Sequence, residues 1–296
     1  MQPNPVLKKL GFSDNDRVII IHTDDIGMCQ ASVSAFADLD VVGVISSGAV
    51  MVPCPWFPAA AAYARAHPEA DLGIHLTLTS EWENYRWGPI STRDRASGLL
   101  DEENYFHRGS AAAQEAGDPT AVQRELEAQV KAALAAGMAP THIDTHMGTV
   151  AHFKFIPAYI QLALKYRVPM MMFRFDRAGW AEWGLDGTEA EMALGMVEEL
   201  EGMGMPLLDH IILMPLDAPE GRMEQVREVF AALRPGITHF IIHPSRETAE
   251  LRAITPDWRG RVADYETFMR EELKEVIRDL GLQVIGYRAI QALMPA

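Results

Sequence analysis

The sequence predicts an α/β protein of the (β/α)-barrel class. Short apolar runs alternate along the chain with segments whose apolar residues recur at helical spacing, which is typical of βα units around a parallel sheet. Eight apolar runs can be distinguished, the strand number of such a barrel. The chain has 296 residues, of which 48% are hydrophobic, so it can fill one barrel, and we expect a single domain over residues 1–296.

The expected strands and helices follow one another along the whole chain. The strands are residues 18–22, 44–52, 72–79, 141–145, 170–175, 210–215, 238–243 and 283–287. The helices include residues 58–66, 121–136, 156–166, 222–233 and 263–280. Boundary signals support the second of these helices, because Asp118-Pro119 can begin a helix and Gly137 can end one.

Residues 81–119 have neither pattern. They lie between βα units, so we expect a long loop inserted after the third strand rather than a linker between domains, and unequal loops of this kind would make the barrel irregular. The loop is rich in aromatic residues, which could stack on a sugar ring or form a small satellite core. These residues are Trp82, Tyr85, Trp87, Tyr105 and Phe106.

An open, doubly wound sheet is the alternative architecture. No GxGxxG follows the first expected strand, and Gly27 in the sequence DDIGM does not complete a dinucleotide-binding fingerprint. The sequence therefore offers no support for a nucleotide cofactor.

The composition and net charge of the chain limit the kinds of molecule that it is expected to bind. The net charge is −15 and the pI is near 5.1, so the surface repels phosphates, and neither nucleic acid nor a membrane is an expected partner. The sequence has no apolar leader and no run long enough to span a bilayer, and we expect a cytoplasmic protein. Cys29 and Cys54 favour two buried thiols over a disulfide framework. A homodimer is compatible with the sequence, which does not set the oligomeric state.

Two adjacent carboxylates end the first expected strand. Asp24 and Asp25 repel each other, and a fold tolerates such a pair only beside a cation, within a hydrogen-bond cage or in solvent. In a parallel barrel the carboxyl ends of the strands form the face where reactions occur. In the third strand, apolar residues alternate so that His75 is directed into the barrel, although a single such histidine would more often be structural.

The fourth expected strand carries three polar residues at a spacing of two. His142, Asp144 and His146 should share one face, and two imidazoles with one carboxylate suit Zn²⁺ or another divalent ion. His146, at the strand end, is the expected ligand, with Asp144 behind it as a supporting partner. No Lys or Glu is expected at a strand end, which disfavours a metal-dependent sugar isomerase or lyase.

Two more charged or titratable residues belong to later strands. Arg174 is a permanent cation in an apolar strand and needs a carboxylate partner, for which the first-strand aspartates are candidates. His243 ends the seventh strand before Pro244 and should face the barrel mouth. Together with the residues of strands one, three and four, they favour a metal site over coincident structural histidines.

Five motifs in this order resemble the YdjC-like carbohydrate deacetylases, which are distant relatives of the NodB-type polysaccharide deacetylases. The motifs are TDDIGM, GIHLTLT, PTHIDTH, FRFD and HPS, and the resemblance runs from about residue 18 to 245 and, with Tyr287-Arg288, over nearly the whole chain. It implies an α/β-barrel enzyme that removes an acetyl group from an N-acetylated sugar with one divalent metal ion, Mg²⁺ or Zn²⁺.

The resemblance also implies a role for each matching residue. Asp25, His75 and His146 would bind the metal ion. Asp24 would be the base that activates water, His243 the protonated acid, and Arg174 the residue that orients Asp24.

The chain departs from the family pattern beside the site. His22-Thr23 stands where the family often has Asn-Ala, and Met147-Gly148-Thr149 follows His146 where the family has further histidines. These departures affect the identity of the substrate more than metal binding. A catalytically silent barrel, which binds a sugar or a metal ion without turnover, is the alternative outside the enzymes.

Overall fold

The computed structural model describes residues 3–295, and its centre is a curled, entirely parallel sheet of seven strands. The strand order is β4-β3-β2-β1-β6-β5, and β7 also pairs with β1. The strands are β1 (Arg17–Ile26), β2 (Ser47–Val50), β3 (Leu72–Leu76), β4 (Ile143–Thr145), β5 (His210–Leu213), β6 (Gly236–Ile242) and β7 (Gln283–Val284). The α/β class expected from the alternating pattern is confirmed.

The central strand β1 is also the longest. Its apolar residues 18–21 are completely buried, which explains why this run is continuous rather than alternating. One edge of β1 pairs with β6 from Arg17 to Thr23. The other edge pairs with β7 at Val18 and Ile19 and with β2 from His22 onward. The two strands β7 and β2 thus occupy successive parts of that edge.

The fifth expected strand, residues 170–175, does not form a strand. Met170 makes an isolated bridge to Ile143 of β4, and Phe173 makes another to Leu208, just before β5. The segment contacts one neighbour through its first residues and the other through its last, so neither contact extends into a ladder. The fifth expected strand is thus reduced to two bridges, and the seven paired strands form a curled sheet.

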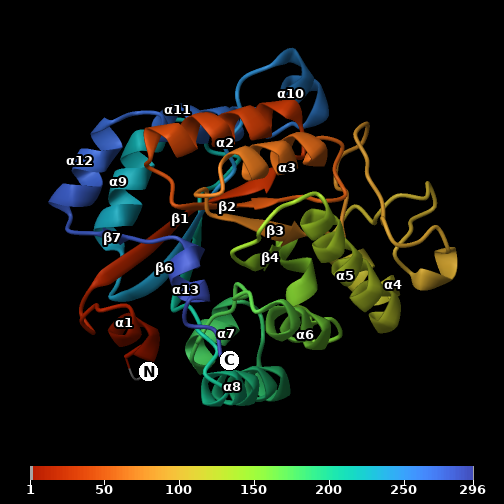
Figure 1. The fold of residues 1–296 in the computed structure, drawn as a ribbon, viewed down its shortest axis with the longest axis horizontal. Coiled ribbons are helices and arrows are strands. Elements are labelled where there is room, and N and C mark those ends of the chain that lie inside the picture. Colours follow the sequence, from red (N-terminus) through yellow and green to blue (C-terminus); the bar gives the residue numbers. More distant parts are fainter. Residues whose placement is uncertain (1–2, 296) are drawn as a thin grey trace.

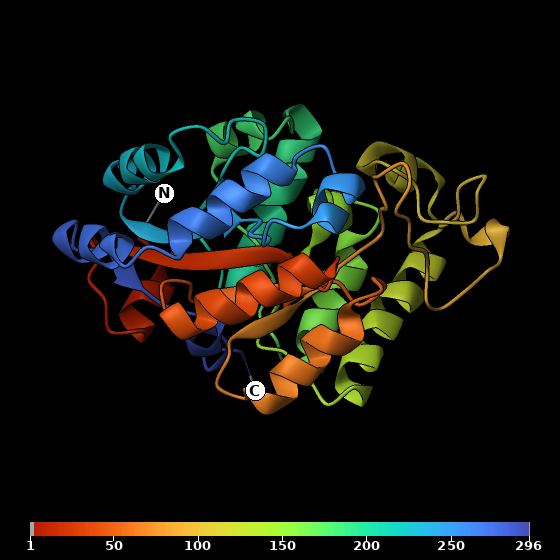
Figure 2. The ribbon, with the colours of Figure 1, turned by 90° about the horizontal axis from the view of Figure 1, so that it is seen from above.

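Helices surround this sheet (Figures 1 and 2). They are α1 (Pro5–Lys9), α2 (Gln30–Val42), α3 (Phe57–Ala66), α4 (Ser110–Ala116), α5 (Pro119–Ala135), α6 (Ile156–Tyr166), α7 (Arg177–Glu182), α8 (Gly187–Gly202), α9 (Arg222–Ala232), α10 (Ala249–Ile254), α11 (Trp258–Phe268), α12 (Glu272–Asp279) and α13 (Tyr287–Gln291). Two short 3₁₀ helices, η1 (Arg95–Ser97) and η2 (His146–Ala151), lie in loops.

Four of the expected helices are found as α3, α5, α6 and α9. Helix α5 begins as predicted, because Asp118 accepts a hydrogen bond from the Ala121 N–H and Pro119 occupies the first turn. The single helix expected at 263–280 is instead two, α11 and α12. Phe268 and Leu273 are both fully buried, yet they would lie about 140° apart around one straight helix. A break between them lets both side chains reach the core.

The long loop expected at 81–119 is confirmed in part. An irregular segment that contains η1 follows β3 and projects beside α5 in both views, but residues 110–116 of the expected loop form α4 (Figures 1 and 2). Trp82, Trp87 and Phe106 are buried, and the rings of Trp82 and Trp87 meet edge to face with centroids 5.3 Å apart. Arg86 ties the loop together through an ion pair with Asp101. Trp82, Trp87 and Phe106 belong to the main hydrophobic core and Tyr85 packs against it, so these rings anchor the loop to the core and do not form a separate satellite core.

No described helix has both the length and the apolar character that a bilayer crossing requires. Cys29 and Cys54 are both buried and unpaired, as expected from their small number.

Candidate metal and catalytic site

Five of the predicted site residues meet at the carboxyl ends of the parallel strands. Asp24 and Asp25 lie near the end of β1, His75 lies in β3, His146 follows β4 directly, and His243 follows β6. Because all the strands run in the same direction, these positions fall on one side of the sheet. The sequence predicts these five residues at strand ends, and the structure brings them together there.

A local irregularity in β1 brings both aspartates to the same place. Consecutive side chains of a regular strand point to opposite faces. Here Asp25 has a φ of 60°, and the pairing of β1 with β2 shifts register between Thr23 and Ile26. As a result His75 Nε2 lies 3.7 Å from Asp24 Oδ2 and 3.5 Å from Asp25 Oδ1. Such strained backbone is typical of functional sites.

Three of the residues form a group that fits a divalent cation. One donor atom from each of Asp25, His75 and His146 lies within 4.8 Å of the others, and Asp25 Oδ1 is 3.1 Å from His146 Nδ1. Asp25 Oδ1 and His75 Nε2 are buried and have no hydrogen-bond partner among the described residues. Buried polar atoms are rarely left without a partner, so a cation at this point would satisfy both.

The second nitrogen of each histidine in this group is held by a carboxylate. His75 Nδ1 is 2.8 Å from Asp144 Oδ1, and His146 Nε2 is 3.1 Å from Glu81 Oε2. Carboxylates in this position orient a metal-binding imidazole and make it a stronger donor. Asp144 supports His75 and not the neighbouring His146, because β3 and β4 pair with His75 opposite Asp144.

Glu81 is a site residue that the sequence analysis missed. Glu81 lies in the loop beyond the end of β3 at Leu76, and it reaches back to His146, so a glutamate contacts the cluster although it is not at a strand end. Its position directly after the GIHLTLT motif and Ser80 was the available signal.

Arg261 of α11 is the second residue that was missed. Its Nη1 lies 2.7 Å from Asp25 Oδ2, its Nε lies 2.8 Å from Asp257 Oδ1, and its guanidinium stands 5.4 Å from the centroid of the Trp82 ring. The side chain is almost completely buried. Arg261 thus pairs with Asp25 Oδ2, whereas Asp25 Oδ1 faces His75 and His146.

Arg174 is not brought to the aspartates of β1. Within the described chain it forms ion pairs with Glu201 of α8 and with Asp209, whose Oδ1 lies 3.3 Å from Nη1. Its backbone N–H donates to the Leu208 carbonyl, which ties this part of the chain to the approach to β5. The structure therefore gives no support for the expected role of Arg174 in orienting Asp24.

Both aspartates are held in the ionised form. Burial would raise the pKa of Asp25, but Arg261 and His146 outweigh it and hold the pKa well below the ordinary value. Burial acts in the same way on Asp24, and the charges of His75 and His22 lower its pKa below the ordinary value. Asp24 is 8% exposed and Asp25 only 1%, so Asp24 is the carboxylate nearer to solvent.

The two histidines of the group have the opposite shift. Burial would lower the pKa of His146, but Glu81 and Asp25 raise it to about 9. For His75 the charges of Asp144 and Asp24 overcome burial and raise the pKa well above the ordinary value. This cluster has more carboxylates than permanent cations and therefore attracts positive charge, as protons or as a divalent ion.

His243 borders the cluster on the more accessible side. Its side chain is 14% exposed, and its Nε2 lies 3.8 Å from Asp24 Oδ2. Its backbone N–H donates to Asp264 Oδ2, which fixes the end of β6. Burial lowers the pKa of His243 below the ordinary value, although the charges of Asp25 and Asp24 oppose this shift. The resting imidazole is therefore neutral near pH 7, whereas the resemblance implied a protonated acid.

Comparison with known proteins decides the family. The family profile described as YdjC-like protein matches residues 18–279, which is most of the chain. The chain belongs to the YdjC-like family. A protein of Thermus thermophilus named carbohydrate deacetylase is 32% identical over 97% of this chain and 98% of its own length. One of Enterococcus faecalis with the same name is 30% identical over 93% of this chain and 99% of its own length.

A solved structure has the fold of this YdjC-like protein. It comes from Enterococcus faecalis V583 and is described as a candidate cellobiose-phosphate cleavage protein. The match covers 93% of this chain and 99% of the other, with a TM-score of 0.73 and 22% identity. The likeness supports the architecture of the curled sheet and its helices.

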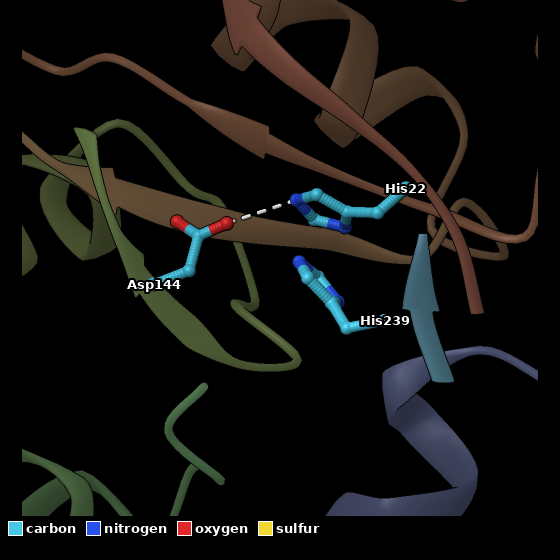
Figure 3. Close-up of side chains that lie close together, drawn as sticks. All are labelled: His22, Asp144 and His239. Atoms are coloured by element: carbon cyan, nitrogen blue, oxygen red, sulfur yellow. Dashed lines mark ion pairs between the residues drawn. The ribbon is translucent and has the colours of Figure 1, made fainter. Parts of the chain in front are cut away.

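The YdjC-like protein also has a buried layer of polar rings beneath the cluster. His22 of β1 and His239 of β6 point toward Asp144 (Figure 3). The ring centroids of the two histidines are 4.6 Å apart, and His239 Nδ1 lies 3.1 Å from the Tyr287 hydroxyl. The sequence analysis noted His22 only as a departure from the family pattern. Its spacing of two residues from Asp24 was the signal that both face the same way.

Proposed function

We propose that this protein is a metal-dependent carbohydrate deacetylase that hydrolyses the amide of an N-acetylated sugar or oligosaccharide. The observation that carries the proposal is the convergence of Asp25, His75 and His146 beside the ionised Asp24 and the more accessible His243. The name carbohydrate deacetylase, shared by relatives that match over nearly their whole length, supports the choice of an acetylated carbohydrate as substrate.

One divalent ion, Mg²⁺ or Zn²⁺, would be held by Asp25 Oδ1 and one nitrogen each of His75 and His146. Two imidazoles and one carboxylate form a donor set of the kind found in hydrolytic metal sites. When bound, such an ion lowers the pKa of coordinated water and polarises a carbonyl oxygen. Asp144 and Glu81 would orient the two imidazoles.

Asp24 is the proposed general base. Its Oδ2 lies near His75 Nε2 and His243 Nε2, and its pKa is kept low, so that the carboxylate is available to accept a proton from water. The oxygen of that water attacks the amide carbon. The proton resides on Asp24 Oδ2 while the tetrahedral carbon forms.

His243 is the proposed general acid. The amine can leave only after its nitrogen has gained a proton, and the C–N bond then breaks to release acetate and the free amino sugar. Because burial favours the neutral form of His243, it acquires this proton during the reaction, and Asp24 Oδ2, 3.8 Å from its Nε2, is the proposed donor. The water proton thus passes through two side chains to the leaving nitrogen.

Acetate release from a panel of N-acetylated amino sugars and their oligomers tests the proposal, with the metal content of the same preparation measured. We expect one equivalent of a divalent ion, loss of activity after chelation, and recovery when the ion is restored. Asp25→Asn should lose both ion and activity, whereas Asp217→Asn, at an exposed position after β5, should keep both.

Other outcomes would contradict the proposal. A bound ion without acetate release from any substrate would indicate a silent binding protein. Rearrangement or cleavage of the sugar without acetate would indicate an isomerase or a lyase. A protein that binds no ion would remove the metal site itself.

A further inference from the structure

His22 stands between two carboxylates beneath the proposed site. It lies in β1, two residues before Asp24, and is completely buried. Its Nε2 is 3.1 Å from Asp24 Oδ1 and 2.9 Å from Asp144 Oδ2, and the second of these contacts is drawn in Figure 3. A single ring nitrogen therefore bridges the proposed base and the carboxylate that supports His75.

The partners of His22 Nε2 decide its protonation. Ionised carboxylates only accept hydrogen bonds, so the nitrogen between them must carry the hydrogen. One N–H cannot point directly at two oxygens. Both contacts are within hydrogen-bond distance, but neither has the alignment of a full hydrogen bond, and we infer that the N–H is shared between Asp24 and Asp144. Without this donor, two buried carboxylates would face each other, which is costly in a medium of low polarity.

Other buried rings pack against the ring of His22 and hold it in this orientation. His239 lies 4.6 Å away between centroids, and the hydroxyl of Tyr287 contacts His239 Nδ1. The ring of His142 meets that of His22 edge to face at 5.0 Å and stacks on Tyr287 at 3.9 Å. These buried rings leave His22 little freedom to rotate away from the carboxylates.

Asp24 is thereby fixed through one oxygen only. Its Oδ1 faces His22, while its Oδ2 faces His75 Nε2 and His243 Nε2 on the reactive side. We propose that His22 is the positioning residue of the base, which holds Asp24 Oδ1 so that Oδ2 is presented to water. This inference rests on the proposed deacetylase function, and it transfers to His22 the role that the resemblance assigned to Arg174.

His22, Asp144 and His239 could instead be read as a second cation site, because one donor atom from each lies within 4.8 Å of the others. Metal content separates this interpretation from the positioning role. A second ion at this place would give two equivalents of metal, one of which would be lost in His239→Gln, whereas the positioning role expects one equivalent in both proteins.

The kinetic test compares two substitutions of His22. His22→Leu removes the donor, and we expect kcat for acetate release to fall on the order of 10²-fold with little change in KM or metal content, because a misplaced base slows only the chemical step. His22→Gln retains a side-chain N–H and should recover much of this loss. His210→Gln, in β5 and in contact with Pro235 and Arg234, is the matched control and should keep most of the activity.

A spectroscopic test does not depend on activity. In the ¹⁵N side-chain spectrum of the histidines of the metal-loaded protein, His22 Nε2 should be protonated, its signal should vanish in His22→Leu, and it should shift in Asp24→Asn. Thermal unfolding of each variant shows whether it is folded.

Each result has a defined meaning. An unprotonated Nε2, an unchanged kcat in folded His22→Leu, or a second equivalent of metal that is lost in His239→Gln would overturn the positioning role. If the wild-type protein releases no acetate, the deacetylase proposal fails, and the spectrum still decides whether His22 donates to Asp24.

Discussion

Arg261 Nη1 lies 2.7 Å from Asp25 Oδ2, although 236 positions separate the two residues in the sequence. Both side chains are buried, and the arginine is the permanent cation in contact with this carboxylate. Removal of one partner from a buried pair leaves an uncompensated charge, which usually costs much more than the loss of an exposed pair.

We therefore predict that Arg261→Leu lowers the free energy of unfolding of the metal-free protein by about 3–5 kcal/mol. The measurement is urea denaturation in the presence of a chelator. Arg246→Leu is the control, because Arg246 pairs with Asp38 at the surface and its loss should cost about 1 kcal/mol or less. An equal decrease in the free energy of unfolding for the two variants would show that the buried pair contributes no more to stability than the surface pair.

Asp24→Asn should keep the metal ion and lose most of the activity. The change removes the proton acceptor but leaves Asp25, His75 and His146 in place, so we expect kcat to fall roughly 10²–10⁴-fold. Metal analysis and kinetics on one preparation check this. If metal and turnover are lost together, Asp24 is a ligand and not the base.

His243→Ala should lower kcat for amide substrates by roughly 10²–10⁴-fold with little loss of metal, the usual contribution of general acid catalysis. An O-acetyl ester has a better leaving group and needs less protonation, so its hydrolysis should be reduced less. The comparison is made with matched amide and ester substrates. An equal decrease for both would assign His243 to binding or to the integrity of the strand end.

Glu81→Gln should weaken metal binding by about 10–100-fold, because Glu81 orients His146 through Nε2. Calorimetric titration of the metal-free protein with Zn²⁺ and with Mg²⁺ measures the change. Glu83→Gln, at an exposed position two residues further along the same loop, should leave the affinity unchanged. A similar affinity for the two variants would mean that Glu81 is not needed to hold the ligand.

Acid should destabilise the protein partly through His239. Burial, and next the charge of His22, lower the pKa of this histidine to about 3, against about 6.5 in an unfolded chain. Between these values the unfolded state binds a proton that the native state does not. The free energy of unfolding should therefore fall as the pH is lowered from 6.5 toward 3, by about 1.4 kcal/mol per pH unit for one proton.

The difference between wild type and His239→Gln isolates this contribution. Urea denaturation of the chelated proteins between pH 6.5 and 4 should give a smaller pH dependence for the variant. An identical pH dependence of the free energy of unfolding in the two proteins would show that the pKa of His239 does not differ between the native and unfolded states.

The five predicted residues that meet in the site show what the sequence determined by itself. Strand periodicity places His75 and His146, and the ends of apolar runs place Asp24, Asp25 and His243. These are properties of a few neighbouring residues, and parallel strands bring their carboxyl ends to one side whatever the details of packing. The α/β class and the membership in the YdjC-like family follow from the same local patterns.

Only the tertiary structure decided which groups contact one another. The bend at Asp25, the partner of Asp144, the ion pairs of Arg174 and the approach of Arg261 all depend on elements distant in the sequence. The reduction of the 170–175 segment to two bridges likewise depends on where β4 and the start of β5 lie. Local spacing determines the face on which a side chain lies. The identity of its partner is set by the register of the strands and the docking of the helices, because a fold in which buried charges lack partners is unstable.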